Sequence, residues 1–275
     1  MPGIRYHLYV MNKSREPGVT LKTFWASLTR GGRIIDIKNE WRQVRHPNFV
    51  IFFAGAVAMF TLMFYFYAIG GRYVDRIVVP SSTDLFLEIL PRWDVTAVIS
   101  YAWLALHIFP LIVTFLYYPR RLPYIMSTIS LFIGVRVIFL ILTPLGPPTG
   151  NIDMTRTTAV FSAMKGVLAF NNENFFSGHT GIPFLFFLIY TIPWVKAVFL
   201  CESIVMGSCV LLARNHYTMD VIGAYFMTYA VYRISRYLFS WLDTRKEMPR
   251  IVENADSQNT RPVESIPETV PEAQN

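Results

Sequence analysis

Six long apolar stretches constrain the fold of this chain more than any other feature of its sequence. They cover residues 48–70, 95–118, 123–145, 179–195, 197–214 and 217–240. A helix needs about 20 apolar residues to cross a hydrocarbon core about 30 Å thick, and each stretch meets or approaches that length. The sequence therefore predicts an all-α, polytopic membrane protein with six transmembrane helices.

The composition excludes the main alternatives to a membrane protein. Only 16% of the 275 residues are charged and 53% are apolar, whereas about 25% of the residues of a soluble domain are charged. The mean hydropathy is +0.37, too high for a cytosolic enzyme and for collagen-like, coiled-coil or disordered chains. The two cysteines, Cys201 and Cys209, lie in one apolar stretch and are expected to pack there rather than to form a disulfide framework.

The basic residues predict how the helices are oriented. Turns at 118–121, 193–196 and 213–215 make hairpins of spans two and three, four and five, and five and six, with longer connections at 71–94 and 146–178. Eighteen Lys and Arg residues then fall on the side of both termini, and six on the other side. By the positive-inside rule both termini are cytoplasmic. The pI near 9.4 then reflects topology and attraction to anionic lipid, and no nucleic-acid partner is expected.

Three regions follow from these patterns. Residues 1–47 form a basic cytoplasmic N-terminal segment, and residues 48–240 form a six-helix transmembrane domain, which the polar residues described below predict to be the catalytic domain. From Pro249 the composition shifts to Pro, Glu, Gln, Asn and Ser. Such a segment cannot bury enough apolar surface to order itself, so 241–275 is predicted to be a disordered cytoplasmic tail.

His216 and Asp220 form the strongest polar group, at the start of the sixth stretch. A spacing of four residues puts both on one face of a helix. The carboxylate can accept the Nδ1–H of His216 and leave Nε2 open, which raises the basicity of the imidazole and fixes its tautomer. The alternative is a structural histidine satisfied by its neighbour, and the spacing alone does not separate the two.

A second group, Phe176-Ser177-Gly178-His179-Thr180, lies at the start of the fourth stretch. Ser177 is a typical N-cap residue, and Gly178 lets the backbone come close to a ligand. The N–H groups of a helix N-terminus form an anion site. Alone, this segment is typical of a loop-to-helix cap. The predicted topology places it on the same side as His216, and the two groups together favour an active site.

Two arginines complete the set of candidate residues. Arg136 lies in the outer half of the third stretch, where an ionisable side chain is costly and needs a reason. It can hold a phosphate bidentately, or form a salt bridge inside the bundle. Arg214, just before His216, is a second candidate for phosphate binding, or else a contact with lipid headgroups.

These residues resemble a known family. Residues 177–180 and 216–225 resemble the two catalytic motifs of the sphingomyelin synthase branch of the type 2 phosphatidic acid phosphatase (PAP2) superfamily. Residues 80–85 are similar to its first outer-loop motif, and Arg136 followed by 143–147 is similar to its third span and exit. The broader superfamily's Lys-x6-Arg-Pro motif is absent here, which favours the synthase branch over ordinary lipid phosphatases.

The resemblance implies a PAP2-like helical bundle and a mechanism. His216 would attack the phosphorus of a phospholipid headgroup to give a phosphohistidine, with Asp220 stabilising the imidazolium. His179 would protonate the departing diacylglycerol oxygen and then take the proton of the incoming alcohol, such as ceramide. Glu173 falls where the family has an aspartate, and a carboxylate suits a cationic headgroup. The candidate substrate- and phosphate-binding residues are Arg136, Ser177, Gly178, Glu173, Arg214 and Tyr217.

Several alternatives stay open. Water in place of the alcohol makes the chain a lipid phosphate phosphatase or a phospholipase C-type hydrolase. A non-catalytic lipid-binding membrane protein and a metal site of His179, His216 and Asp220 are further readings. The family expectation is an enzyme without metal or cofactor, whose partners are a phospholipid donor and a lipid alcohol within the membrane and whose active site faces the extracytoplasmic side. The headgroup and a homo-oligomeric state stay open.

Overall fold

The computed structural model describes residues 41, 44, 47–77, 79–153, 162, 170 and 174–242. Nearly all of the predicted N-terminal segment and tail, together with Arg156, Lys165 and Glu173, lies outside these residues. The described residues fold as helices, which confirms the all-α prediction for this part of the chain. The helices are α3 (Pro47–Asp75), α4 (Leu85–Ile89), α5 (Thr96–Tyr117), the 3-10 turn η1 (Pro119–Arg121), α6 (Leu122–Leu142), α9 (Gly178–Ile189), α10 (Pro193–Leu212) and α11 (Thr218–Leu238).

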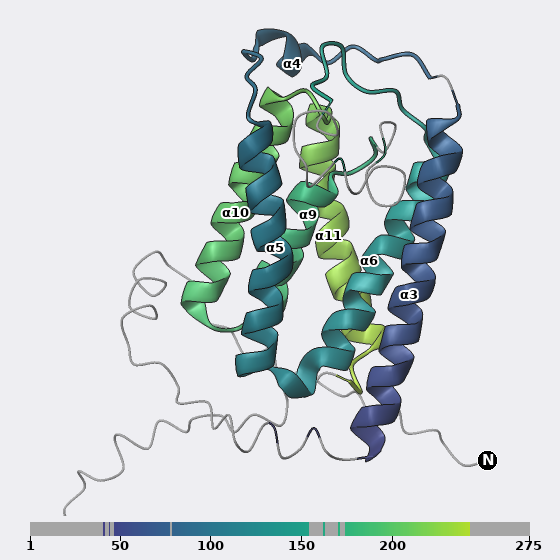
Figure 1. The fold of residues 1–275 in the computed structure, drawn as a ribbon, viewed down its shortest axis with the longest axis vertical. Coiled ribbons are helices and arrows are strands. Elements are labelled where there is room, and N and C mark those ends of the chain that lie inside the picture. Colours follow the sequence, from purple (N-terminus) through teal and green to yellow (C-terminus); the bar gives the residue numbers. More distant parts are fainter. Residues whose placement is uncertain are drawn as a thin grey trace, which may run out of the picture.

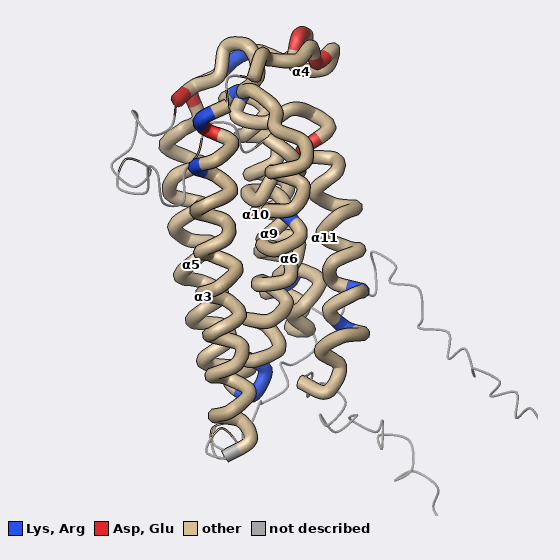
Figure 2. The backbone as a smooth tube through the Cα atoms, turned by 90° about the vertical axis from the view of Figure 1, so that its right-hand side faces the viewer, with Lys and Arg blue, Asp and Glu red and all other residues tan. Residues whose placement is uncertain are grey.

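The long helices run up and down along a common direction, and α4 lies across one end of the bundle (Figure 1). We call this end, which also holds the connections after α3, α6 and α10, the site end. The turns at η1 and between α9 and α10 lie at the opposite end. Charged residues gather mostly at the two ends, and acidic residues at and beside α4 mark the site end (Figure 2). This distribution is the one that a protein embedded in a bilayer requires.

Four helical segments among the described residues are long and apolar enough to cross a membrane: Asn48–Asp75, Thr96–Tyr117, Pro119–Leu142 and Pro193–Leu212. The chain is therefore an integral, multi-pass membrane protein. The fourth and sixth predicted spans correspond to less typical helices. α9 has only 12 residues, about 18 Å at 1.5 Å per residue, and α11 carries Asp220, Arg233 and Arg236. Six spans and cytoplasmic termini stay predictions.

The predicted turn at 193–196 is wrong, because α10 already begins at Pro193. Proline lacks a backbone N–H and has a helical φ, so it fits the first turn of a helix, where that N–H would be unsatisfied anyway. The turn instead covers residues 190–192. The hydroxyl of Tyr118 holds it by accepting the N–H groups of Thr191 and Ile192, each at 3.2 Å. The fourth predicted stretch therefore ends at Ile189 rather than at residue 195.

Two basic side chains bind the last carbonyl groups of α9. Arg121 donates to the carbonyl of Ile189 at 3.2 Å, and Lys196 donates to that of Phe187 at 2.9 Å. The Arg121 guanidinium is fully buried and lies 5.4 Å from the ring centroids of both Tyr118 and Tyr124. Cations at a helix C-terminus are favourable because the helix dipole is negative there. The short α9 is thus stabilised at the opposite end by its neighbours.

α9 lies at the centre of the helix packing. It packs against α10 and α11, α11 also packs against α6, and α3 packs on the outside of α6. Gly181 makes the close approach possible, because a Cβ there would lie 2.8 Å from both the Phe132 ring and the Thr228 hydroxyl. This packing fixes the N-terminus of α9 next to α6 and α11, which carry Arg136 and Asp220.

Candidate active site

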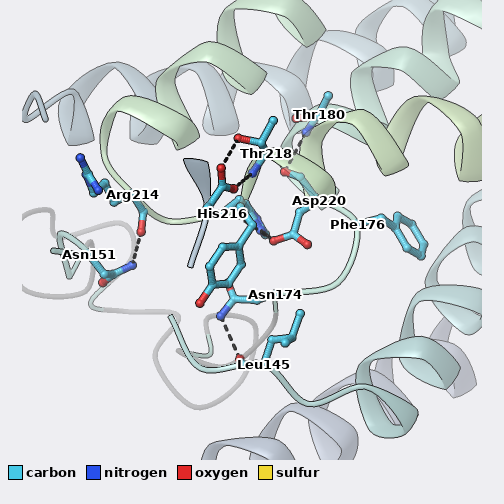
Figure 3. Close-up of polar contacts among 12 residues, drawn as sticks. Leu145, Asn151, Asn174, Phe176, Thr180, Arg214, His216, Thr218 and Asp220 are labelled. Carbon is cyan, nitrogen blue, oxygen red and sulfur yellow. Dashed lines mark hydrogen bonds and ion pairs between the residues drawn. The ribbon is translucent and has the colours of Figure 1, made fainter. Parts of the chain in front are cut away.

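His216 and Asp220 form a buried pair at the start of α11 (Figure 3). His216 Nδ1 lies 3.3 Å from Asp220 Oδ2, and the two residues are 3% and 1% exposed. The same Oδ2 accepts the N–H of Tyr217 at 3.0 Å as part of a capping box. His216 precedes the helix, so this cap, rather than one helical face, brings the pair together. Because a carboxylate only accepts, Nδ1 is the donor and the neutral imidazole keeps its lone pair on Nε2.

The second predicted group joins this pair through the backbone. Ser177 is the N-cap of α9, as predicted, and its hydroxyl accepts the N–H of Thr180 at 3.3 Å. The N–H of Ser177 donates to the carbonyl of Asp220 at 3.0 Å. As a result, the rings of His179 and His216 lie edge to face, with centroids 5.9 Å apart. The starts of α9 and α11 therefore present two imidazoles to one small volume.

Phe176 shapes the chain as it enters α9. Its φ is +28°, which is rare for a residue with a side chain. The ring is fully buried and packs edge to face against the Phe132 ring, with ring centroids 5.5 Å apart. This packing stabilises the strained backbone. Backbone strain of this kind is common at active sites and ligand-binding sites, where it helps to fix the position of a functional group. Here the carbonyl of Phe176 accepts from Arg136 Nε at 3.2 Å.

Arg136 lies beside the first turn of α9. It is 6% exposed, and its Nη1 donates to the hydroxyl of Tyr67 at 3.1 Å. A Cβ on Gly178 would lie 3.5 Å from the guanidinium carbon, so the cation faces the position that a side chain would take at the first residue of α9. The guanidinium and the helix N-terminus thus favour negative charge at the same place.

Arg136 and His179 both line a cavity of about 90 Å³. The cavity lies between α3, α5, α6 and α9, within the apolar part of the bundle. Most of its wall is aromatic or aliphatic, which suits the chains and backbone of a lipid. It is lined by Phe64, Tyr67, Trp103, His107, Phe132, Ile133, Arg136, Gly178, His179 and Ile182.

Arg214 and Tyr217 bind the loops around the site. Arg214 has a φ of +55°, and its Nη2 donates to the carbonyls of Leu87 at 2.8 Å and Leu90 at 3.4 Å, at the end of α4. The Tyr217 hydroxyl donates to the carbonyl of Gly146 at 2.9 Å and accepts the N–H of Ser82 at 2.9 Å. Burial raises the pKa of Tyr217, which keeps this hydroxyl protonated. Both side chains are thus engaged with backbone groups of the site end.

Asp84 is a supporting residue that the sequence analysis did not single out. Its Oδ1 accepts the N–H groups of Phe86 and Leu87 at the start of α4, at 3.0 and 3.1 Å. Its Oδ2 accepts the N–H of Thr218, the first residue of α11, at 2.6 Å. Burial alone would raise the pKa of Asp84, but the hydrogen bonds from Thr218, Leu87 and Phe86 outweigh it and lower that pKa. An aspartate directly before an apolar run is an N-cap signal that could have revealed this role.

The described part of the chain contains no group of three or more His, Cys, Asp or Glu residues that could hold a metal ion. The groups that it does bring together are a carboxylate-oriented imidazole, a second imidazole, an arginine and a helix N-terminus. These are the elements of a nucleophile, a general acid–base and an anion site, which together suit phosphoryl transfer.

Residues 173–237 match the family model described as PAP2 superfamily C-terminal. The match covers about a quarter of the chain and includes Ser177, His179, His216 and Asp220. No curated protein is significantly similar to the chain.

Proposed function

We propose that the chain is an integral-membrane lipid phosphotransferase of the sphingomyelin synthase type, which moves a phospho-headgroup from a glycerophospholipid to a lipid alcohol such as ceramide. The PAP2-type C-terminal region supports phosphatase or phosphotransferase chemistry on lipid phosphates. The apolar helices provide the membrane setting. The observation that carries the proposal is the pairing of His179 with His216, whose ring centroids are 5.9 Å apart, beside the Asp220 carboxylate.

In the first step, Nε2 of His216 attacks the phosphorus of the donor lipid. The bond between phosphorus and the diacylglycerol oxygen breaks, and His179 in its protonated form gives that oxygen a proton. The products are diacylglycerol and a phosphohistidine. Asp220 accepts the Nδ1–H of His216 at 3.3 Å, so it stabilises the positive charge that develops on this imidazole.

In the second step, the hydroxyl of the incoming lipid alcohol attacks the same phosphorus. Neutral His179 takes the hydroxyl proton, the bond from phosphorus to Nε2 breaks, and His216 returns to its neutral state. Proton transfer of this kind contributes about 10²–10⁴-fold to a rate. The enzyme ends the cycle with the protons where they began, because His179 gives one and takes one.

The N-terminus of α9 and Arg136 stabilise charge on the phosphoryl oxygens. Phosphoryl transfer demands mainly positioning and electrostatic stabilisation. The N–H groups after Ser177 and the guanidinium of Arg136, which lies 3.5 Å from where a Cβ on Gly178 would be, are the fixed positive groups at this place. We assign both to the phosphate and place the site on the extracytoplasmic side of a six-span bundle with cytoplasmic termini.

The aromatic wall of the cavity supports a lipid alcohol over water as acceptor. Phe64, Trp103 and Phe132 line the volume that reaches His179, and apolar walls hold lipid chains better than water. Hydrolysis would proceed through the same phosphohistidine, so the two histidines do not distinguish a transferase from a hydrolase. The outcome depends on which acceptor occupies the cavity.

The test uses purified protein in liposomes that contain fluorescent ceramide and one of phosphatidylcholine, phosphatidylethanolamine or phosphatidylinositol. Products are identified by mass spectrometry, with and without a chelator, and His216→Ala is run in parallel. A new ceramide phospholipid that the variant does not make is the expected result, and its mass names the headgroup. Headgroup release without a ceramide product would replace the transferase by a hydrolase. Loss of activity on chelation would instead indicate a metal site.

A further inference from the structure

His107 is an ionisable residue on an apolar helix, and the mechanism above does not use it. It lies near the middle of α5 (Thr96–Tyr117), which is long and apolar enough to cross a membrane. Its side chain is exposed on the bundle, and it lines the same cavity as His179 and Arg136. An ionisable residue at such a depth is costly unless it has a partner, so its presence points to a function.

The orientation of the His107 ring is fixed from within α5. Nδ1 lies 2.8 Å from the carbonyl oxygen of Trp103, one helical turn earlier. The imidazole also lies against the Trp103 indole, with ring centroids 4.0 Å apart. A carbonyl oxygen only accepts hydrogen bonds, so Nδ1 carries the proton. The neutral ring then keeps a lone pair on Nε2, which has no hydrogen-bond partner within the described part of the chain.

The neutral form is the one that suits this place. A second proton on His107 would put a positive charge on an apolar helix face, in a cavity that already holds the Arg136 cation, and burying an unpaired charge is far more costly than burying a neutral polar group. An Nε2 lone pair in hydrocarbon still lacks the hydrogen bond that water would give it. A ligand that brings an O–H or N–H group to this nitrogen removes that cost.

We propose that Nε2 of His107 is a hydrogen-bond acceptor subsite for an O–H or N–H group of the lipid that occupies the cavity, separate from the hydroxyl that reacts at His179. This assignment deepens the proposed function, since it rests on a lipid alcohol entering the cavity. It makes His107 a specificity-determining residue. A lipid with a second donor near its reacting hydroxyl satisfies Nε2, whereas a diacylglycerol offers only ester oxygens there, which are acceptors.

The experiment measures binding in the inactive His216→Ala background, so it needs no turnover. The protein is placed in lipid nanodiscs and labelled with a photoreactive ceramide, and unlabelled lipids compete for the cavity. The competitors are ceramide, 3-deoxyceramide, N-methylceramide and diacylglycerol. The second substitution is His107→Phe, which keeps a ring against Trp103 but has no acceptor, or His107→Gln, whose carboxamide oxygen can still accept. Ile108→Phe, at an exposed position outside the cavity wall, is the matched control.

With His107 intact, ceramide should compete about three- to tenfold better than diacylglycerol, the range of one net hydrogen bond. His107→Phe should remove this preference, His107→Gln should keep part of it, and Ile108→Phe should leave it unchanged. If 3-deoxyceramide competes more weakly than N-methylceramide, the donor to Nε2 is the second hydroxyl of ceramide. If N-methylceramide competes more weakly, the donor is the amide N–H. An unchanged preference in His107→Phe, or none with His107 intact, would overturn the subsite. Neither result depends on whether the active chain transfers or hydrolyses.

Discussion

His179 and His216 carry the same side chain but are held in different surroundings. His216 is bound to Asp220 through Nδ1 at 3.3 Å, which leaves Nε2 open as the nucleophile of the proposed mechanism. His179 lies in the first turn of α9 and on the wall of the cavity that also holds Arg136. In the proposed mechanism His179 donates a proton to the departing alcohol oxygen. A donor whose leaving group needs no proton distinguishes this role from a purely structural one.

We predict that His179→Gln lowers transfer from a phospholipid donor by about 10²–10⁴-fold. With 4-nitrophenyl phosphocholine as donor the first turnover should be far less affected, because 4-nitrophenolate leaves without being protonated. The measurement is the burst of nitrophenolate release beside phospholipid turnover. An equal loss with both donors would contradict the acid role and indicate that His179 positions the phosphate instead.

The residues of the site were predictable to the extent that local sequence determines them. The four-residue spacing of His216 and Asp220 and the N-cap role of Ser177 are local features, and the structure contains both. The bond from the Ser177 N–H to the Asp220 carbonyl is a tertiary contact that no local pattern encodes. The contact of Arg214 with the carbonyls of Leu87 and Leu90 is also tertiary, because these residues precede Arg214 by more than 120 positions. The sequence therefore did not show it.

At the scale of elements, one carboxylate caps two helices. Asp84 binds N–H groups of both α4 and α11, and α11 carries Asp220. We expect Asp84→Ala to lower the free energy of unfolding by about 0.5–2 kcal/mol, the usual cost of losing an N-cap. It should also lower transfer activity at temperatures where the variant stays folded, because the start of α11 is no longer held. Thermal unfolding in detergent and transfer assays check both effects.

Asp94 provides the matched control for Asp84. It accepts the N–H and the hydroxyl of Thr96 at 3.1 and 2.6 Å, at the start of α5, and these bonds lower its pKa. Asp94→Ala removes two side-chain hydrogen bonds at the start of a helix that carries neither His179 nor His216. It should affect unfolding and leave transfer activity unchanged. If both variants lose activity equally, the Asp84 effect is general destabilisation of the site end.

The pH dependence of the Asp84 cap has a definite sign. Because its pKa is lower in the folded chain than its ordinary value of 3.8, its ionised form is favoured by folding. The stabilisation is present above the unfolded-state pKa of about 4 and is lost as the pH falls through the lower folded-state pKa. The difference in Tm between the natural chain and Asp84→Asn should therefore shrink between pH 5 and the most acidic pH that the detergent allows. A difference that grows on acidification would contradict this account.

The C-terminus of α9 depends on a buried arginine. Replacing Arg121 by Met leaves the carbonyl of Ile189 without this donor, so we expect a loss of about 1–3 kcal/mol of stability. Arg121→Lys should restore only part of this stability, because the compact ammonium group has neither the planar shape nor the weak hydration with which a guanidinium contacts aromatic rings such as those of Tyr118 and Tyr124. Unfolding in detergent measures this loss. Unchanged stability in Arg121→Met would show that Lys196 and the Tyr118 hydroxyl suffice.

The same region shows where element boundaries could not be read from sequence. The apolar run continues from α9 into α10 with Pro193 as its most visible interruption, and proline fits both the end of one helix and the start of the next. The position of the break is decided by the Tyr118 hydroxyl, which binds Thr191 and Ile192 from another part of the chain. The type of each element was determined locally, and this boundary was determined by tertiary contact.

At the scale of the whole molecule, the orientation in the membrane is the prediction to test. The charge distribution between the connections predicts that the site end lies on the extracytoplasmic side. With Cys201 and Cys209 replaced by Ala, Ser81→Cys at the site end should react with an impermeant maleimide that is present on the extracytoplasmic side of the protein's own membrane. Ser240→Cys, after α11 at the opposite end, should react only after the membrane is opened. Both positions are exposed, so the reverse pattern would invert the orientation.

The contact between Ser177 and Asp220 also has a consequence for biosynthesis. Residue 220 lies on the last helix that the structure describes, so a growing chain contains the start of α9 before the carbonyl that binds Ser177 is made. Until the start of α11 is made, the chain lacks the contact between Ser177 and Asp220 that holds His179 beside His216. The candidate site therefore forms only in the last stage of synthesis, and on the proposed function a shorter nascent chain is inactive toward the lipids around it.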